Sequence, residues 1–301
     1  MRSFMSAFAA FAIRCSGWKK HAADPVWRKN YFEKLRANND KPYTPPPFPY
    51  RSKLEKRVEN GVEVLSFRPG RQKKLVYLHG GSFCEPPRIL HLLLCDHLAA
   101  KTDHEVLFPL YKRAPAHTFE ETFAFLETFY RGLLESTRPE DLVLMGDSSG
   151  GGLSLSFCEY LKTIGLPQPA KLVLLSPVLD AEMAEPFPAS FDKTDPSLQI
   201  DFLREACRNW AGDADVRDWR ISPISGDFTG LAPITLLVGG YEAFVVQARR
   251  FRDKCMDLGV ELDYREYPGM NHVFVIYPIP EANRAQGELV SLLRSEVSAK
   301  G

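Results

Sequence analysis

The chain has 301 residues, of which 45% are hydrophobic and 25% are charged, a composition typical of globular proteins. Its 38 basic and 38 acidic side chains cancel, so no overall field attracts nucleic acid or an anionic membrane. The length accommodates one large α/β domain with insertions, or two domains, and no apolar run is long enough to predict a membrane span.

The first apolar stretch covers residues 4–13 and is followed by Arg14, without a clear small-residue cleavage site. We therefore predict an amphipathic helix, with Phe4, Phe8 and Phe11 on one face, rather than an export signal. Helical patterns continue to about residue 40, where a proline-rich segment at 41–50 favours an extended connector.

Beyond this connector, apolar strand-like runs alternate with helical patterns. The predicted strands are residues 62–67, 74–78, 105–109, 142–145, 171–177, 234–238 and 262–267. The predicted helices are residues 86–100, 118–135, 148–163, 241–258 and 281–299. This alternation predicts an α/β fold with a mostly parallel central sheet and helices on both faces. Residues 180–217 break the alternation with prolines and aromatic side chains, so we interpret them as an insertion.

The strand at 142–145 leads into Gly146-Asp147-Ser148-Ser149-Gly150, in which two glycines flank a serine at G-x-S-x-G spacing. This spacing suits a strained strand-to-helix turn that exposes a serine hydroxyl above a parallel sheet. The string is common by itself, but here a buried strand precedes it and a helix follows it. Ser148 is therefore our candidate nucleophile.

A serine hydroxyl needs a neighbouring base, and the base needs an orienting carboxylate. His272 follows the last strand, at the sheet edge where ligands bind in parallel sheets, and is the candidate base. Glu242 follows the preceding strand, in the chain order expected of this fold. Asp180 lies after the strand that begins at residue 171, at the same edge, and is the rival carboxylate, whereas Asp263 opens its strand and lies at the wrong end.

A glycine-rich loop follows the strand at 74–78. Backbone N–H groups of Gly80, Gly81 and Ser82, together with that of Ser149, are candidate donors of an oxyanion hole. We expect His79, in the same loop, to be structural. Asp147 is interpreted as a hydrogen-bonding brace of the serine turn.

The sequence contains no phosphate-binding glycine loop, no dinucleotide fingerprint and no metal-spaced cluster, so we expect no cofactor and no metal. Six cysteines are scattered without C-x-x-C spacing: Cys15, Cys84, Cys95, Cys158, Cys207 and Cys255. We interpret them as reduced thiols, mostly buried, of a cytoplasmic protein.

These motifs resemble the hormone-sensitive-lipase-like family of α/β-hydrolases, in consistent order between about residues 60 and 290. The matching stretches are His79-Gly80-Gly81-Ser82, Tyr111-Lys112-Arg113-Ala114-Pro115, Gly146-Asp147-Ser148-Ser149-Gly150-Gly151, Arg220-Ile221-Ser222-Pro223 and Gly269-Met270-Asn271-His272. Two departures stand out: Ser82 replaces the third glycine of the first motif, and Glu242 replaces the usual aspartate.

The resemblance implies a helical cap over the site. It divides the chain into an N-terminal part of the cap (1–45), a first part of the hydrolase core (46–179), a second cap segment (180–217) and a second part of the core (218–301).

The expected function is a serine carboxylesterase that hydrolyses short- to medium-chain esters through an acyl-enzyme on Ser148. Phe83 is a predicted substrate-pocket residue, with Phe187, Phe191 and Trp210 as further aromatic candidates. The alternatives are an amide or peptide-bond hydrolase with the same triad, or a non-catalytic small-molecule-binding relative. The expected partner is a small-molecule ester, without nucleic acid, and a homodimer remains open.

Overall fold

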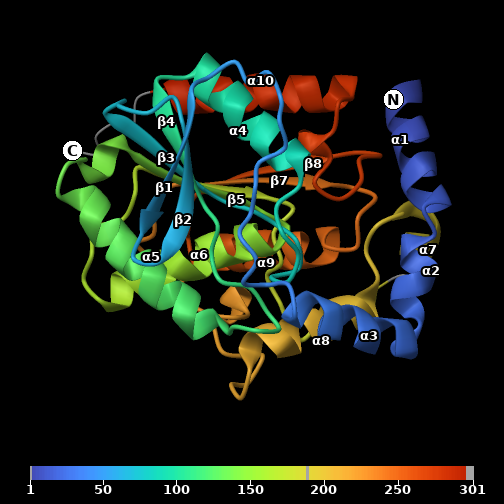
Figure 1. Cartoon of the computed structure of the whole chain (residues 1–301). Coiled ribbons are helices and arrows are strands. Elements are labelled where there is room, and N and C mark those ends of the chain that lie inside the picture. Colours follow the sequence, from blue (N-terminus) through green and yellow to red (C-terminus); the bar gives the residue numbers. More distant parts are fainter. Residues whose placement is uncertain (1, 188–189, 296–301) are drawn as a thin grey trace.

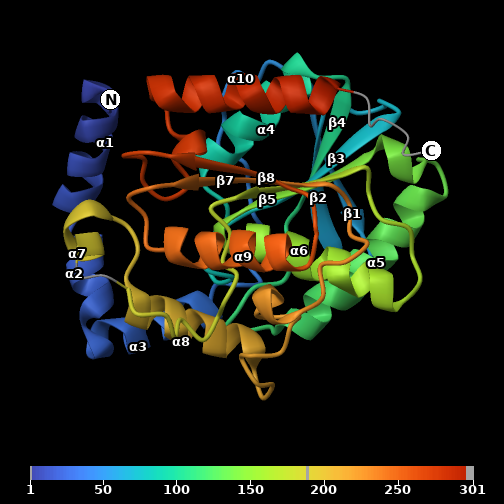
Figure 2. The same ribbon diagram turned by 180° about the vertical axis from the view of Figure 1, so that it is seen from behind.

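A computed structural model describes residues 2–187 and 190–295 of the chain, and Figures 1 and 2 show it from opposite sides. A single twisted sheet lies at its centre. The strands are β1 (Leu54–Glu59), β2 (Val62–Phe67), β3 (Lys73–Leu78), β4 (His104–Pro109), β5 (Leu142–Asp147), β6 (Lys171–Leu175), β7 (Ile234–Gly239) and β8 (Leu262–Tyr267).

The strands lie in the order β1-β2-β4-β3-β5-β6-β7-β8. β1 pairs antiparallel with β2, and β2 pairs antiparallel with β4. Every other pairing is parallel, so the prediction of a mostly parallel sheet is confirmed. β1 was not expected from the sequence, because this edge strand is mostly exposed and four of its six residues are charged.

The helices are α1 (Phe4–Cys15), α2 (Trp18–Ala23), α3 (Pro25–Arg36), α4 (Ile89–Lys101), α5 (Phe119–Leu134), α6 (Ser148–Thr163), α7 (Ser190–Thr194), α8 (Ile200–Ala211), α9 (Val245–Asp257) and α10 (Pro280–Arg294). Short 3₁₀ turns cover Pro139–Asp141, Pro223–Ser225 and Phe274–Ile276. Helices α4 and α10 cover one face of the sheet, and α5, α6 and α9 cover the other (Figures 1 and 2).

The side chains of β5 show why the sheet is buried on both faces. Leu142 and Leu144 pack into the hydrophobic cluster on the side of α5 and α6. Val143 and Met145 pack into the cluster on the side of α4 and α10. Successive residues of a strand point to opposite faces, so an unbroken apolar run satisfies both layers at once.

A group of helices from two distant segments packs beside the carboxyl ends of the strands: α1, α2 and α3 with α7 and α8 (Figures 1 and 2). Phe202 of α8 stacks on Phe32 of α3, with ring centroids 5.1 Å apart. Trp18 of α2 meets Phe202 edge to face at 5.2 Å. Arg28 of α3 forms an ion pair with Glu205 of α8 at 3.0 Å.

Most of the predicted elements are present, with shifted ends. The fourth helix begins at Ile89 rather than at residue 86, and α9 begins at Val245 rather than at 241. The predicted end of the last helix, residue 299, lies outside the described residues, as do 188 and 189 of the inserted segment. Within the described part of the chain, no helix has the length and apolarity that crossing a bilayer requires.

Candidate active site

Ser148 occupies the sharp turn between β5 and α6, with a φ of +51°. A positive φ is uncommon for a residue with a side chain and marks a constrained backbone. Flanking glycines are required sterically: a Cβ at Gly146 would lie 2.3 Å from the carbonyl oxygen of Gly150, and one at Gly150 would lie 2.0 Å from that of Leu78. The G-x-S-x-G spacing is therefore a packing requirement of this turn.

The structure brings Ser148, His272 and Glu242 together in one line. His272 Nε2 lies 3.0 Å from Ser148 Oγ, and His272 Nδ1 lies 3.1 Å from Glu242 Oε1. With a proton on Nδ1, the imidazole donates to the carboxylate and accepts from the serine hydroxyl. These distances lie within the reach required for proton transfer.

Glu242 is fully buried and its second carboxylate oxygen is also occupied. Glu242 Oε2 accepts hydrogen bonds from the Ser176 hydroxyl at 2.7 Å and from the Gly239 N–H at 3.0 Å. Ser176 also accepts from the N–H of Val273, next to the histidine, at 3.2 Å. Ser176 therefore links the loop that carries Glu242, which we call the acid loop, to the loop that carries His272. Its position before Pro177 in the sequence did not reveal this role.

The electrostatic environment of His272 favours its protonated form. Burial alone would lower the pKa of its imidazole, but the charge and hydrogen bond of Glu242 outweigh this effect, and Asp195 and Asp147 add to it. The net result is a pKa above the ordinary value of 6.5. A raised pKa strengthens the histidine as a base for the serine proton.

The candidate oxyanion donors divide into two groups. The Gly80 N–H donates to Asp147 Oδ1 at 3.0 Å, so the expectation that Gly80 serves as an oxyanion donor is wrong for this conformation. Gly81 and Ser82 follow with φ values of +126° and +53°. Glycine adopts such values readily, whereas for Ser82 the conformation is strained, as is found in functional loops. The Ser149 N–H lies in the first turn of α6, where N–H groups have no partner one turn earlier.

Asp147 is the brace that the sequence predicted. Besides the Gly80 N–H, its carboxylate accepts the Tyr77 hydroxyl at 2.8 Å, and His91 Nε2 lies 3.4 Å away. Burial would raise the pKa of this carboxyl, but these partners lower it overall. His79 stacks on Tyr111 at 4.6 Å, and burial lowers its pKa to about 3, so its neutral ring serves packing.

The rival carboxylates lie elsewhere. Asp180 accepts from Arg250 at 2.8 Å and from the N–H of Glu182 at 3.0 Å. Asp263 pairs with Arg265 near the start of β8. Neither carboxylate hydrogen-bonds to the imidazole of His272, whose Nδ1 contacts Glu242.

A cavity of about 620 Å³ opens onto Ser148 and His272. Its walls come from the serine turn, the glycine loop and the helix group. The apolar wall residues include Ile13, Trp18, Leu198, Phe202, Leu203 and Ile276. Trp18 and Phe202 were not singled out from the sequence. Phe202 could have been found from its helical spacing, because it lies on the buried face of α8 together with Leu203 and Ala206.

Phe83 does not line this cavity, so its prediction as a pocket residue is wrong. Its ring is buried and stacks on Trp210 at 4.7 Å. Trp210 is itself fully buried and serves the core between α8 and the glycine loop. Phe187 and Phe191 line a separate cavity of about 330 Å³ beside α7 and α8.

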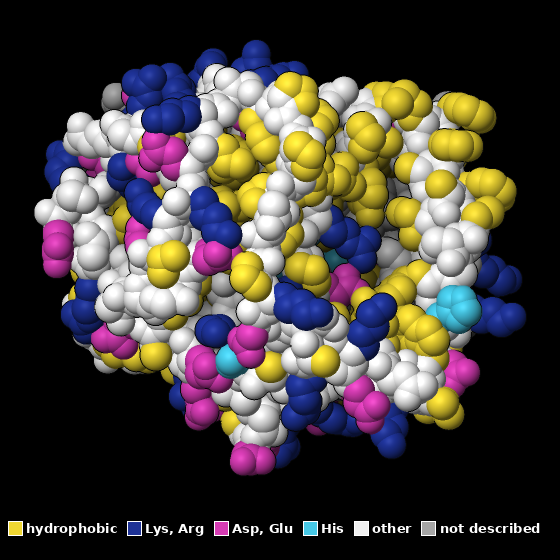
Figure 3. All heavy atoms as spheres, in the orientation of Figure 1, with side chains coloured by type: hydrophobic (Ala, Val, Ile, Leu, Met, Phe, Trp, Pro, Cys, Tyr) yellow, Lys and Arg dark blue, Asp and Glu magenta, His cyan; other side chains and the backbone are white. Residues whose placement is uncertain are grey.

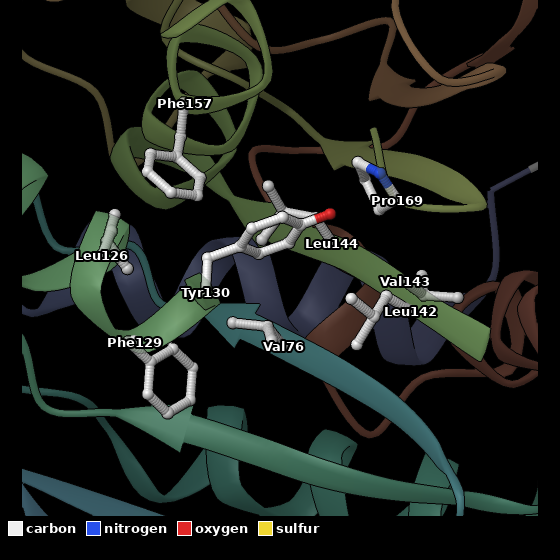
Figure 4. A pocket seen from close by; sticks show the side chains of 9 residues that line it. All are labelled: Val76, Leu126, Phe129, Tyr130, Leu142, Val143, Leu144, Phe157 and Pro169. Atoms are coloured by element: carbon white, nitrogen blue, oxygen red, sulfur yellow. The ribbon is translucent and has the colours of Figure 1, made fainter. Parts of the chain in front are cut away.

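A third, much smaller void lies in the core between α5, α6 and the sheet, and Figure 4 shows the residues that line it. Its volume is about 10 Å³, and its walls include Tyr130, Phe157 and Leu144. This void is a packing gap rather than a ligand site, because it has room for at most one water molecule. Among the described residues, no group of three or more His, Cys, Asp or Glu side chains could hold a metal ion.

An inserted turn between α7 and α8 connects the helix group to the acid loop. Asp195 is buried, and its Oδ1 accepts the N–H groups of Ser197 and Leu198 at 2.9 and 3.0 Å. Its Oδ2 accepts the N–H of Ala243, next to Glu242, at 2.9 Å. One carboxylate thus shapes the turn that places Leu198 in the cavity wall and holds the loop carrying the acid.

Known proteins share this architecture. The family described as alpha/beta hydrolase fold matches residues 75–276. A curated relative named Esterase, from Acinetobacter venetianus, is 30% identical and covers 77% of this chain and 78% of its own length. The Acetyl-hydrolase of Streptomyces hygroscopicus is 32% identical, covering 72% and 75%. The crystal structure of an esterase from the bacterial hormone-sensitive lipase (HSL) family aligns with a TM-score of 0.83 at 26% identity, covering 99% of this chain and 100% of that one.

Proposed function

This chain belongs to the alpha/beta hydrolase family, among the relatives of hormone-sensitive lipase, and we propose that it is a serine carboxylesterase that forms an acyl-enzyme on Ser148. The observation that supports this proposal most directly is the relay from Ser148 through His272 to Glu242, with contacts of 3.0 and 3.1 Å. A hydroxyl, a base and a buried carboxylate in this order are the parts that acyl transfer requires.

In the acylation step, Ser148 Oγ attacks the ester carbonyl while its proton passes to His272 Nε2. Glu242 stabilises the imidazolium that forms and keeps the ring in the required tautomer. The N–H groups of Gly81, Ser82 and Ser149 are the proposed donors to the oxyanion of the tetrahedral intermediate. His272 then returns the proton to the leaving alcohol, which leaves an acyl group on Ser148.

Deacylation repeats the sequence with water as the nucleophile. His272 takes a proton from the water molecule, the hydroxide attacks the acyl carbonyl, and the same donors stabilise the second tetrahedral intermediate. Collapse of this intermediate releases the carboxylic acid, and the proton returns from His272 to Ser148 Oγ.

The proposed substrates are esters with short to medium acyl chains. The cavity of about 620 Å³ at Ser148 is in the range of small-molecule sites. We propose that residues 1–45 and 180–217 form the cap of this cavity, and residues 46–179 and 218–301 the core. The contacts of Trp18 and Phe32 with Phe202 support this division, because they join the two cap segments.

We propose a cytoplasmic location, since all six cysteines are free thiols and five of them are buried, as expected in a reducing compartment. A homodimer stays a prediction that sedimentation velocity can test.

The decisive assay compares hydrolysis of p-nitrophenyl butyrate by the wild type, by Ser148→Ala and by the control Ser156→Ala. Ser156 is a buried serine of the same helix whose hydroxyl bonds to the Leu153 carbonyl at 3.2 Å. We expect the first variant to lose at least about a thousandfold in kcat/KM and the control to retain activity. Equal rates for Ser148→Ala and wild type would refute the proposal.

The two alternative functions have their own measurements. A fluorophosphonate probe labels the activated serine of a hydrolase, so absence of labelling at Ser148 would favour the non-catalytic binding protein. Matched ester and amide substrates with the same acyl group separate an esterase from an amide hydrolase, and we expect faster turnover of the ester.

A further inference from the structure

Helix α1 presents its largest apolar side chains to solvent. The exposed fractions of Phe4, Phe8 and Phe11 are 83%, 60% and 58%, while the small side chains of Ser6 and Ala10 face the body and are buried. A helix on the surface of a water-exposed protein normally has the opposite arrangement, with its bulky apolar residues turned inward.

The exposed side chains form one continuous stripe. Phe4, Phe8 and Phe11 follow the i, i+4, i+7 spacing of a single helix face, and Met5 lies beside them and is also exposed. We refer to these four residues as the aromatic face. Figure 3 shows hydrophobic side chains gathered on α1, at the right of that view, across a hollow from hydrophobic side chains of the main body.

The charge carried by the segment that contains α1 and α2 is positive, although Glu281 of α10 accepts hydrogen bonds from Ser3 at the start of α1. Residues 2–23 contain Arg2, Arg14, Lys19 and Lys20 but no aspartate or glutamate, although the net charge of the whole chain is zero. Arg14, in the last turn of α1, and Lys20, in α2, are both exposed. Although the charges of the whole chain balance, this segment combines exposed aromatic rings with basic side chains.

We propose that α1 docks the protein onto the surface of an anionic lipid bilayer, with the aromatic face in the acyl boundary. Basic side chains that flank an apolar helix face are the features by which interfacial helices bind anionic lipids. The same features argue against a second copy of this chain as the occupant, because pairing two such segments brings Arg14 and Lys20 toward like charges.

Because α1 lies beside the cavity that contains Ser148, docking of α1 also affects the active site. Ala12, Ile13 and Ser16 line the cavity that contains Ser148, so the docked helix is one wall of that cavity. Arg2 Nη2 donates to the side chain of Asn271, next to His272, at 2.7 Å. If the proposed esterase function holds, docking brings the mouth of the cavity to a surface rich in ester lipids.

The test is co-sedimentation of the full chain, carrying Ser148→Ala, with vesicles of phosphatidylcholine and phosphatidylglycerol. The inactive variant separates binding from hydrolysis, so a failure of the esterase proposal does not affect this result. We expect Phe8→Ser/Phe11→Ser to bind the anionic vesicles at least tenfold more weakly. The control Val58→Ser, which removes an exposed apolar side chain of β1, should bind like the parent protein.

Two further measurements complete the test. Lys20→Glu should weaken binding to the anionic vesicles but not to pure phosphatidylcholine, as should raised salt. When Ser148 is left intact, the variant Phe8→Ser/Phe11→Ser should hydrolyse soluble p-nitrophenyl butyrate at the wild-type rate. This result would show that the variant folds.

Absence of binding by the parent protein to anionic vesicles would overturn the proposal. It would also be overturned if the parent sedimented as a dimer and Phe8→Ser/Phe11→Ser as a monomer with unchanged vesicle binding, because the aromatic face would then be a subunit interface.

Discussion

At the scale of single residues, Glu242 explains how a longer acid fits a site that usually holds an aspartate. One carboxylate oxygen contacts His272 Nδ1, and the other is held by the Ser176 hydroxyl and the Gly239 N–H. The extra methylene group is therefore accommodated by two fixed donors that aim the carboxylate. The same carboxylate sets the charge state of the imidazole, which gives a pH-dependent prediction.

The first prediction concerns the acidic limb of the pH–rate profile. His272 acts as a base only when neutral, so kcat/KM should rise with pH through the pKa of its imidazole, above 6.5 in the wild type. Glu242→Gln removes the main charge that raises this pKa, so the limb should move to lower pH. Loss of the orienting carboxylate should also reduce kcat by about a thousandfold or more.

The control is Asp180→Asn, which removes the rival carboxylate and its pairing with Arg250. We expect it to keep the position of the acidic limb. A shift of the limb in Asp180→Asn, with none in Glu242→Gln, would assign the acid to Asp180 instead.

The residues that could be predicted from the sequence are those whose position depends on strand ends. Ser148, Glu242 and His272 follow the parallel strands β5, β7 and β8, and parallel strands bring their carboxyl ends to one edge. Gly80 and Phe83 could not be placed in this way. Which direction a loop N–H points, and whether Phe83 faces a ligand or Trp210, depends on tertiary contacts that no local pattern encodes.

At the scale of elements, the turn between α7 and α8 shows how the helix group is tied to the catalytic loops. Asp195 accepts from the turn with one oxygen and from the acid loop with the other. Lys19 of α2 also donates to the Asp195 carbonyl at 3.1 Å. Through these bonds, three segments far apart in the sequence share one anchoring point beside the site.

The second prediction is that Asp195→Asn lowers kcat/KM about tenfold and lowers the melting temperature. The amide can keep one oxygen toward Ser197 and Leu198, but its NH₂ group then faces the N–H of Ala243, and an unsatisfied buried donor costs roughly 1–3 kcal/mol. Removal of the charge should also shift the acidic limb slightly to lower pH, because Asp195 raises the pKa of His272.

Steady-state kinetics across pH and thermal unfolding measure these effects. Ser197→Ala is the matched control, because it removes the hydroxyl bond to Asp195 Oδ1 but leaves the contact with Ala243. Equal losses in both variants would mean that the turn, and not the link to the acid loop, matters.

The presence of most helices and strands could be predicted from the periodicity of the sequence. Their exact ends and the edge strand β1 could not. β1 consists mainly of charged, solvent-facing residues, so its apolar signal is weak and its identity depends on pairing with β2. The start of α4 at Ile89 follows two prolines at 86 and 87, which belong to the loop rather than to the first turn.

At the scale of the whole molecule, one buried ionisable group affects the stability of the folded protein. Glu159 of α6 is buried, and neither carboxyl oxygen has a hydrogen-bond partner among the described residues. Burial raises its pKa to about 9, although Lys254 and Lys162 act in the opposite direction. The folded protein therefore keeps this carboxyl protonated at neutral pH.

The third prediction follows from this difference between folded and unfolded chains. Between the ordinary pKa of 4.5 and the folded value of about 9, the unfolded chain loses the Glu159 proton while the folded protein retains it. The free energy of unfolding should therefore fall as pH rises, by up to about 1.4 kcal/mol per pH unit. Glu159→Gln should remove this contribution and gain stability relative to wild type with rising pH.

Urea unfolding at pH 6, 7 and 8 measures the slope, with the exposed Glu33→Gln of α3 as the control. Parallel pH profiles for wild type and Glu159→Gln would contradict the buried, protonated state of this carboxyl.

The α/β class and the parallel sheet were predictable because they depend on the alternation of patterns along the whole chain. The helix group was identified by its position in the sequence and by the family resemblance, but its internal packing was not. The stacking of Phe32 on Phe202 joins segments separated by about 170 residues, and no local pattern pairs such distant rings.

That separation also affects how the protein is made. Trp18 and Phe32 leave the ribosome long before their partner Phe202 is synthesised. At a rate of about 5–20 residues per second, the delay is roughly 10–40 seconds. During this interval the aromatic side chains of the first helices lack the partner on α8 that covers them in the folded protein. The nascent chain is thus a candidate client of chaperones that bind near the ribosomal exit tunnel, and slower synthesis should lengthen its dependence on them.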